Sequence, residues 1–271
     1  MSASTARNYL ITGGGRGIGR GLSRLLLQSG HRVCILDNNV EELDHTAATF
    51  SKKYTRGRDF DTVTCNLRQP SEITSAVQSA SKLFDGHLDV LVNNAGYTAG
   101  VGGANVSDMT LELWNATLET NLTAPMLMSQ HCTPLLAKSS SRPSGGNIIH
   151  ISSTRATMSE PDSEAYATTK AGLLGLSQSM AVSLAPRGVR VNAIIPGWIH
   201  VENECKEADE QGRKWEDGLS ETDHAWHLTG RVGNVEDILR AVQYLSENDG
   251  VTGTEMVVDG GVTRKMVYPE E

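Results

Sequence analysis

The 271-residue chain has no long apolar run and no excess of basic charge. No uninterrupted apolar stretch approaches the roughly 18 residues that a membrane-spanning helix needs. Asp and Glu number 32 against 24 Lys and Arg, which gives a formal net charge of −8. Because nucleic acids attract surfaces rich in Lys and Arg, this balance argues against a nucleic-acid partner, and the missing apolar run argues against a membrane one.

Cysteine is also scarce, and its spacing fits no metal site. The four cysteines form no CxxC pair, and Cys34 and Cys65 stand in apolar runs that favour a buried, unpaired thiol. His224 and His227 are three residues apart, whereas helical metal ligands usually stand four apart with an acidic ligand nearby. We therefore expect no metal ion and no disulfide framework.

Targeting signals are missing as well. The N-terminal segment MSASTARNYLITGGG has no apolar signal-peptide core, and the sequence ends in PEE rather than in a peroxisomal tripeptide. The expected location is the cytoplasm.

Short β-branched runs alternate with amphipathic stretches along the whole chain. The runs that read as strands are Tyr9–Thr12, Arg32–Asp37, Asp61–Asn66, Val90–Asn93, Asn147–Ser152, Arg190–Ile195 and Glu255–Asp259. The stretches with helical periodicity are Ile18–Ser29, Val40–Lys53, Ser71–Phe84, Leu111–Gln130, Tyr166–Leu184 and Val235–Leu245. Most strand runs are almost continuously apolar, as in strands that are covered on both faces. The pattern predicts an α/β fold, a single Rossmann domain over residues 1–271 with a doubly wound parallel sheet of seven strands flanked by helices.

One long segment, at about residues 198–230, interrupts this alternation between the sixth strand and the last helix. It is rich in charge and contains Trp198, Trp215 and Trp226. Long excursions inside a compact domain are usually functional or mobile, so we expect a substrate loop here.

The stretch TGGGRGIG at residues 12–19 follows the first strand and opens the first helix. Glycine allows a tight turn and lets backbone N–H groups approach a pyrophosphate at the positive helix N-terminus. A glycine cluster by itself is also compatible with a simple turn, but its place between strand and helix favours a dinucleotide site. The residues predicted to bind are Gly13, Gly15, Arg16, Gly17, Ile18 and Gly19.

Asp37 at the end of the second strand is the main indicator of which dinucleotide binds. A carboxylate there would accept hydrogen bonds from the adenosine ribose and repel a 2′-phosphate. Asp37 is equally well placed to cap the following helix, and Arg16 in the glycine loop would favour a phosphate. Since a like-charge clash outweighs one flexible cation, we predict NAD, with NADP less favoured.

Further motifs follow in a fixed order. They are NNAG at residues 93–96, Asn121 in TNLTAP, ISS at 151–153, YATTK at 166–170, IIPGWI at 194–199 and VDGG at 258–261. Together with the glycine loop, their order and spacing over essentially the whole chain resemble the short-chain dehydrogenase/reductase family. The resemblance implies a nicotinamide-dependent oxidoreductase that acts on CH–OH groups and assembles as a homo-oligomer, a tetramer or dimer.

The resemblance also implies a catalytic tetrad of Asn121, Ser153, Tyr166 and Lys170. Ser153 is preferred to Ser152 because the family serine stands thirteen residues before the tyrosine. Tyr166 and Lys170 are at i and i+4 on one helix face, a pair that by itself is equally compatible with a solvated surface. As a catalytic pair, the ammonium and an oxidised nicotinamide would lower the pKa of Tyr166 and make it a general acid/base.

Other cofactor positions rest on the resemblance alone. They are Asn66, Leu67, Asn93, Ala95, Gly96, Pro196, Gly197 and Ile199, with Tyr166 and Lys170. The sequence departs from the family at Asn66, where Asp is frequent, and at Val201, where Thr is frequent.

The substrate is the least determined feature. Ser153 and Tyr166 are expected to bind its oxygen and Trp198 its body, while Arg155 either recognises an anionic or polar group or is a surface residue. A polyol, a sugar and a cyclic or secondary-metabolite ketone all fit the reading of a secondary alcohol/ketone oxidoreductase. Two alternatives stay open: retained NAD that serves epimerisation or dehydration, and a non-catalytic dinucleotide sensor.

Overall fold

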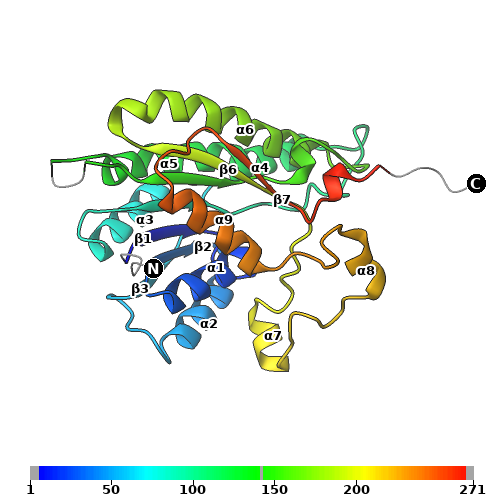
Figure 1. The fold of residues 1–271 in the computed structure, drawn as a ribbon, viewed down its shortest axis with the longest axis horizontal. Coiled ribbons are helices and arrows are strands. Elements are labelled where there is room, and N and C mark those ends of the chain that lie inside the picture. Colours follow the sequence, from blue (N-terminus) through cyan, green and yellow to red (C-terminus); the bar gives the residue numbers. More distant parts are fainter. Residues whose placement is uncertain (1–5, 141–142, 267–271) are drawn as a thin grey trace, which may run out of the picture.

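A computed structural model of the protein describes residues 6–140 and 143–266 and contains a sheet of seven parallel strands (Figure 1). The strands are β1 (Asn8–Thr12), β2 (Arg32–Asp37), β3 (Phe60–Thr64), β4 (Val90–Asn93), β5 (Asn147–Ile151), β6 (Arg190–Pro196) and β7 (Glu255–Val258). Their order across the sheet is β3-β2-β1-β4-β5-β6-β7, which confirms the predicted seven-stranded Rossmann-type arrangement. The order reverses between β1 and β4, and ligands of such sheets bind outside the carboxyl ends of the strands at this reversal.

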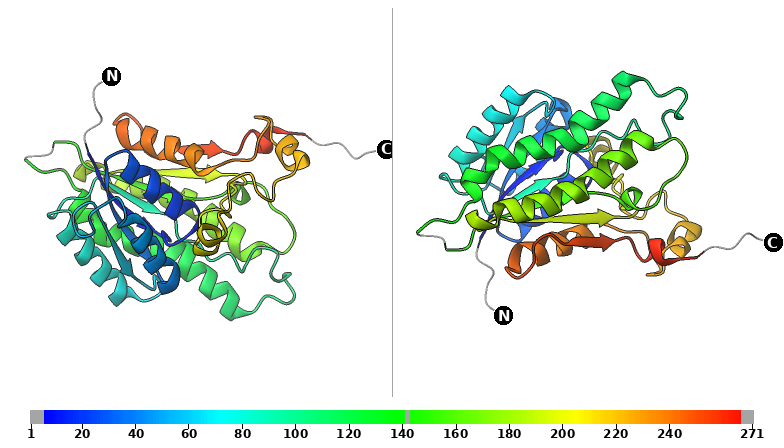
Figure 2. Two further views of the ribbon diagram at one scale, coloured as in Figure 1. Left: turned by 90° about the horizontal axis from the view of Figure 1, so that it is seen from below. Right: turned by 90° about the horizontal axis from the view of Figure 1, so that it is seen from above.

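Helices cover both faces of the sheet (Figure 2). One face carries α1 (Gly17–Gln28), α2 (Val40–Phe50) and α9 (Val235–Glu247). The opposite face carries α3 (Pro70–Leu83), α4 (Leu111–Leu118), α5 (Ala124–Leu136) and α6 (Glu164–Leu184). The strands are therefore buried on both sides.

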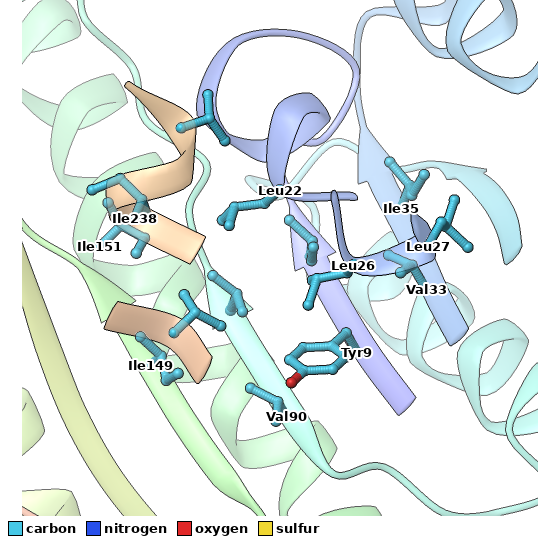
Figure 3. Packing of buried hydrophobic residues seen from close by; sticks show 14 of the residues in the cluster. Tyr9, Leu22, Leu26, Leu27, Val33, Ile35, Val90, Ile149, Ile151 and Ile238 are labelled. Atoms are coloured by element: carbon cyan, nitrogen blue, oxygen red, sulfur yellow. The ribbon is translucent and has the colours of Figure 1, made fainter. Parts of the chain in front are cut away.

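The apolar core follows from this layering. Along β5, Ile149 and Ile151 pack toward α1 and α9, while Ile148, which precedes them, packs toward α3 and α5. Figure 3 shows the first of these layers, where Tyr9 and Ile149 of the sheet meet Leu22 and other helix residues. Since successive strand residues face opposite sides, a strand covered on both faces must be apolar at almost every position.

The expectation of one uninterrupted helix over 111–130 is wrong. Helix α4 ends at Leu118, a π-helical turn spans Glu119–Thr123, and α5 continues to Leu136. The side chain of Asn121 within the π turn accepts from Tyr97 N at 2.6 Å and donates to Tyr97 O at 3.1 Å. Such one-turn widenings of a helix are frequent at functional sites.

Residues 198–230 form an ordered excursion that contains α7 (Lys206–Gln211) and α8 (Glu221–Trp226). Buried ion pairs join it to the first helix: Arg20 contacts Glu204 and Asp209, and Arg24 also contacts Glu204. The backbone is tied in as well, because Gly17 N donates to Glu204 O at 2.7 Å. The excursion is therefore fixed directly to the glycine loop.

Within the described part of the chain, no helix is long and apolar enough to cross a membrane. Residues 1–5 and 267–271, which belong to the two terminal segments used to predict the location, lie outside the described residues.

Candidate active site

A groove of about 750 Å³ lies over the carboxyl ends of the central strands. It gathers most of the residues predicted to bind a cofactor, namely Gly13, Arg16, Gly17, Ile18, Asp37, Asn66, Leu67, Ala95, Gly96, Tyr166, Lys170, Pro196 and Gly197. These residues come from segments far apart in the sequence, and the parallel sheet brings them to one edge. The groove therefore lies where the strand order reverses.

Gly15 and Gly19, the two predicted glycines that do not line the groove, have contacts within the glycine loop and with its neighbours. A Cβ at Gly19 would clash with the carbonyl oxygen of Gly13 and lie 2.6 Å from Asn94 Nδ2. Gly15 packs against Asp37, and its N–H donates to Asp37 Oδ2 at 2.8 Å. Gly15 and Gly19 thus shape the loop, while Gly13 and Gly17, both with positive φ, line the groove.

Asp37, the last residue of β2, lines the groove and is held in place there. Its second oxygen, Oδ1, accepts from Asn39 N at 2.9 Å, so both carboxylate oxygens have a backbone donor. The alternative role of Asp37 as helix cap is wrong, because the side chain that caps α2 is that of Asn39. Arg16 is exposed and makes no ion pair with a described residue.

Asn93 does not line the groove, which corrects the prediction for this residue. It is buried beneath the groove, where its amide donates to Ser129 Oγ and His150 Nδ1, both at 3.2 Å. Because Val92 packs toward α1, its neighbour Asn93 has to face α5. The neighbouring Asn94 lines the groove instead, and its Nδ2 donates to the carbonyl oxygens of Thr12 and Gly13 at 3.0 Å. The period of two along β4 was the sequence signal that distinguishes the two asparagines.

Tyr166 and Lys170 lie together at the start of α6. Lys170 Nζ is 5.4 Å from the centroid of the Tyr166 ring, so the solvated-face alternative is wrong for this pair. Lys170 is buried and donates from Nζ to Ile151 O at 2.8 Å. Ser153 follows β5 and also lines the groove. The lysine thus sits behind the tyrosine and close to the sheet.

Asn121 approaches the same place from the π turn. A Cβ at Gly96 would lie 3.9 Å from Lys170 Nζ and 4.0 Å from Asn121 Oδ1. Asn121 is buried, and its Nδ2 also donates to Thr169 Oγ1 at 3.3 Å. The space above Gly96 therefore borders both polar groups, and a side chain there would fill it.

The pKa shifts differ from the expectation. Burial raises the pKa of Tyr166, and the hydrogen bond with Ser153 and the charge of Arg155 offset this only in part. Burial also lowers the pKa of Lys170, to about 8. The expected lowering of the Tyr166 pKa concerns the state with an oxidised nicotinamide bound, whereas without it the net shift is upward. Burial, followed by the charge of Lys170, lowers the pKa of the buried His150 to about 3. In this state Tyr166 keeps its proton at neutral pH, and His150 is neutral.

A second cavity of about 520 Å³ joins the groove. Both are lined by Ser153, Tyr166, Ile18 and Gly197. The residues that line only the second cavity include Arg155, Met158, Glu160, Trp198, Ile199, Trp226, His227 and Val262. Ser153 and Tyr166 therefore stand at the junction, where a ligand of one cavity meets a ligand of the other.

Two predicted residues have a different setting from the one expected. Ile199 was assigned to the cofactor, but it lines the second cavity and pairs with Gly233 in an isolated parallel bridge. Arg155 lines the same cavity, yet its Nε donates to Glu160 Oε1 at 2.9 Å. Because Glu160 neutralises this guanidinium, Arg155 is not a free anchor for an anion. The spacing of Arg155 and Glu160 in the sequence gave no indication that they form an ion pair.

The groove fits a dinucleotide by its size and by its donors and acceptors. Small-molecule sites span about 300–1,000 Å³, and this groove lies within that range. It combines the N-terminus of α1, the fixed carboxylate of Asp37 and the ammonium of Lys170. Among residues 6–140 and 143–266, no group of three or more His, Cys, Asp or Glu side chains is placed to hold a metal ion.

The sequence is similar to known proteins over almost its whole length. Residues 13–263 match the family model described as Enoyl-(Acyl carrier protein) reductase. The chain is 36% identical over 266 residues to an uncharacterized oxidoreductase from Thermotoga maritima, which covers 96% of this chain and 97% of the relative.

The fold is also similar to that of solved structures. An apo SCOR enzyme from Clostridium thermocellum superposes with a TM-score of 0.80 at 33% identity, and 97% of this chain and 95% of that one are covered. A short chain dehydrogenase from Burkholderia cenocepacia J2315 in complex with NADP has a TM-score of 0.78 at 28% identity, with 95% and 98% covered. The chain therefore belongs to the short-chain dehydrogenase/reductase family, whose members are oxidoreductases that use a nicotinamide dinucleotide.

Proposed function

We propose that this protein interconverts a secondary alcohol and a ketone by hydride transfer, with Tyr166 as the general acid/base and NAD(H) as the preferred cofactor. The observation that carries the proposal is the meeting of two cavities at Ser153 and Tyr166, with the buried Lys170 behind them. A substrate in the smaller cavity has its reacting oxygen at these two hydroxyls.

The side chains at this junction have different roles in the proposed reaction. Ser153 and Tyr166 bind and orient the substrate oxygen by hydrogen bonds. When bound, the nicotinamide ring of the cofactor supplies or accepts the hydride. In the direction of reduction, Tyr166 donates its proton to the substrate oxygen, and its raised pKa keeps that proton available at neutral pH.

Lys170 and Asn121 support this proton transfer. The ammonium of Lys170 favours the phenolate once Tyr166 has given up its proton. The space above Gly96 borders both Lys170 and Asn121, and we assign to it a water that carries a proton away from Lys170. The residues that would hold the cofactor line the larger groove, and they are Gly13, Gly17, Asp37 and Lys170.

The preference for NAD(H) rests on the setting of Asp37. Both carboxylate oxygens are held by backbone donors, so the charge cannot swing away from a 2′-phosphate. Two cations, Arg16 and Arg68, also line the groove, and Arg16 is exposed and free to turn toward the same region. A fixed anion beside a second phosphate opposes NADP by like-charge repulsion.

The test is a substrate panel with both cofactors. Purified protein is assayed at 340 nm with secondary alcohols, polyols, sugars and cyclic ketones, each with NAD(H) and NADP(H), and Tyr166→Phe serves as the control. Turnover of an alcohol or ketone with NAD(H), lost in Tyr166→Phe, is the expected result. Preference for NADP(H) would refute the cofactor assignment alone.

The panel also includes an enoyl thioester, because the matching family model is described as an acyl-carrier-protein reductase. Oxidation of NADH by the enoyl thioester but by no ketone would refute the alcohol/ketone assignment. Cofactor that stays bound with no net change at 340 nm would point instead to epimerisation or dehydration, and binding with no reaction at all to a sensor.

A further inference from the structure

His227 lies immediately after α8 and lines the smaller cavity. Its ring is 3% exposed, and its Nδ1 is 3.0 Å from the carbonyl oxygen of Asp223. A carbonyl oxygen can only accept a hydrogen bond, so Nδ1 carries the proton in the neutral ring. Nε2 is then an acceptor with a free lone pair.

Nothing in the described protein fills that lone pair. Nε2 of His227 has no hydrogen-bond partner among the described residues and is shielded from bulk water. The ring is also held in place: its centroid is 6.1 Å from that of Trp198, and a Cβ at Gly260 would lie 3.0 Å from its Cδ2. A buried acceptor without a donor is unfavourable. His227 lines the smaller cavity, so a ligand bound there can supply the donor.

The rest of the cavity offers a ligand little other polar contact. Met158, Trp198, Trp226 and Val262 contribute apolar surface. The charged pair of Arg155 and Glu160 satisfies itself. Thr154 and Ser159 also line the cavity, and the hydroxyl of Ser159 already donates to the carbonyl oxygen of Glu160. For a neutral ligand, the cavity therefore offers the hydroxyls of Ser153 and Tyr166 at one point and the acceptor of His227 at another.

We propose that His227 is a specificity-determining residue that accepts a hydrogen bond from a second hydroxyl group of the substrate. The site then selects diols and hydroxy ketones over alcohols and ketones with a single oxygen. The inference rests on the proposed function, because the first oxygen is the one that reacts at Tyr166.

The test uses the full-length protein with NAD⁺ and two kinds of probe, cyclohexanol and the 1,2-, 1,3- and 1,4-cyclohexanediols. The ratio of kcat/KM for the best diol to kcat/KM for cyclohexanol is measured for wild type, His227→Leu and His227→Gln. Leucine removes the acceptor and keeps the bulk, whereas the glutamine amide restores an acceptor near Nε2. His224→Leu is the matched control, since His224 belongs to α8 but does not line the cavity.

We expect wild type to prefer a diol and His227→Leu to lower the ratio about tenfold or more, as for a lost buried hydrogen bond. His227→Gln should recover part of the ratio, and His224→Leu should leave it unchanged. A wild-type preference for cyclohexanol overturns the inference. A ratio that His227→Leu does not change also overturns it, and this is the result expected if a bound water already donates to the acceptor.

A separate readout distinguishes failure of this inference from failure of the proposed function. The ¹⁵N resonance of His227 Nε2, assigned by its loss in His227→Gln, is recorded with NAD⁺ with and without saturating diol. If no probe is oxidised but the resonance moves as for a newly bonded acceptor, the inference stands and the proposed reaction fails on this panel. If neither turnover nor a shift is seen, the inference is overturned.

Discussion

Replacing Glu204 by leucine should destabilise the protein through a buried cation that it leaves behind. The Glu204 side chain is 2% exposed and accepts from Arg20 Nη1 at 3.2 Å and from Arg24 Nε at 3.1 Å. Arg20 is 3% exposed and cannot reach water when its partner is removed. Arg24 is 33% exposed and can turn outward, so the cost falls mainly on Arg20.

The size of the effect follows from what Arg20 keeps. Removing one partner of a buried ion pair costs about 3–5 kcal/mol. Arg20 retains Asp209 and the hydroxyl of Thr46, so we expect the lower end, about 3 kcal/mol of unfolding free energy. The double variant Arg20→Met, Glu204→Leu should be less destabilised than Glu204→Leu, because it leaves no buried guanidinium of α1 without this partner.

The assay is equilibrium unfolding in urea, followed by far-UV circular dichroism. Glu207→Leu on α7 is the control, since its side chain is 68% exposed and should contribute less than about 0.5 kcal/mol. A loss below about 1 kcal/mol in Glu204→Leu, or a double variant weaker than the single one, would contradict the reasoning. We also expect a higher KM for the substrate in Glu204→Leu, because the segment from Glu204 carries the wall of the smaller cavity.

Three further predictions concern the cofactor, the glycine loop and pH. Asp37→Asn should lower the NAD-to-NADP ratio of kcat/KM by about tenfold or more, measured at 340 nm, and an unchanged ratio would remove Asp37 from cofactor selection. Gly19→Ala should weaken NAD binding in calorimetry, because its Cβ meets the Gly13 carbonyl, and wild-type affinity would mean that the loop shape does not matter. Burial raises the pKa of Tyr9 to about 12, so stability should be full below the unfolded-state value of about 10 and fall by about 3 kcal/mol as pH rises toward 12, but not in Tyr9→Phe, in urea titrations at each pH.

Local sequence patterns predicted much of this fold, since strand runs, the glycine loop and the Tyr166–Lys170 spacing are all properties of neighbouring residues. Alternation of apolar runs predicted the seven strands, because a strand covered on both faces is recognisable from its own residues. The glycine loop was predictable because a tight turn between strand and helix restricts which residues fit. The predicted assembly as a tetramer or dimer stays a prediction.

What the sequence left undecided depends on contacts between distant segments. Only the folded chain pairs Arg155 with Glu160 and widens the helix at Asn121 around the backbone of Tyr97. The sign of the Tyr166 pKa shift also depended on the tertiary structure, because burial by surrounding elements outweighs the hydrogen bond with Ser153 and the charge of Arg155. Periodicity along the chain determined which residues reach the edge of the sheet. Packing between distant elements decided the burial and the partners of each side chain, and with them its chemistry.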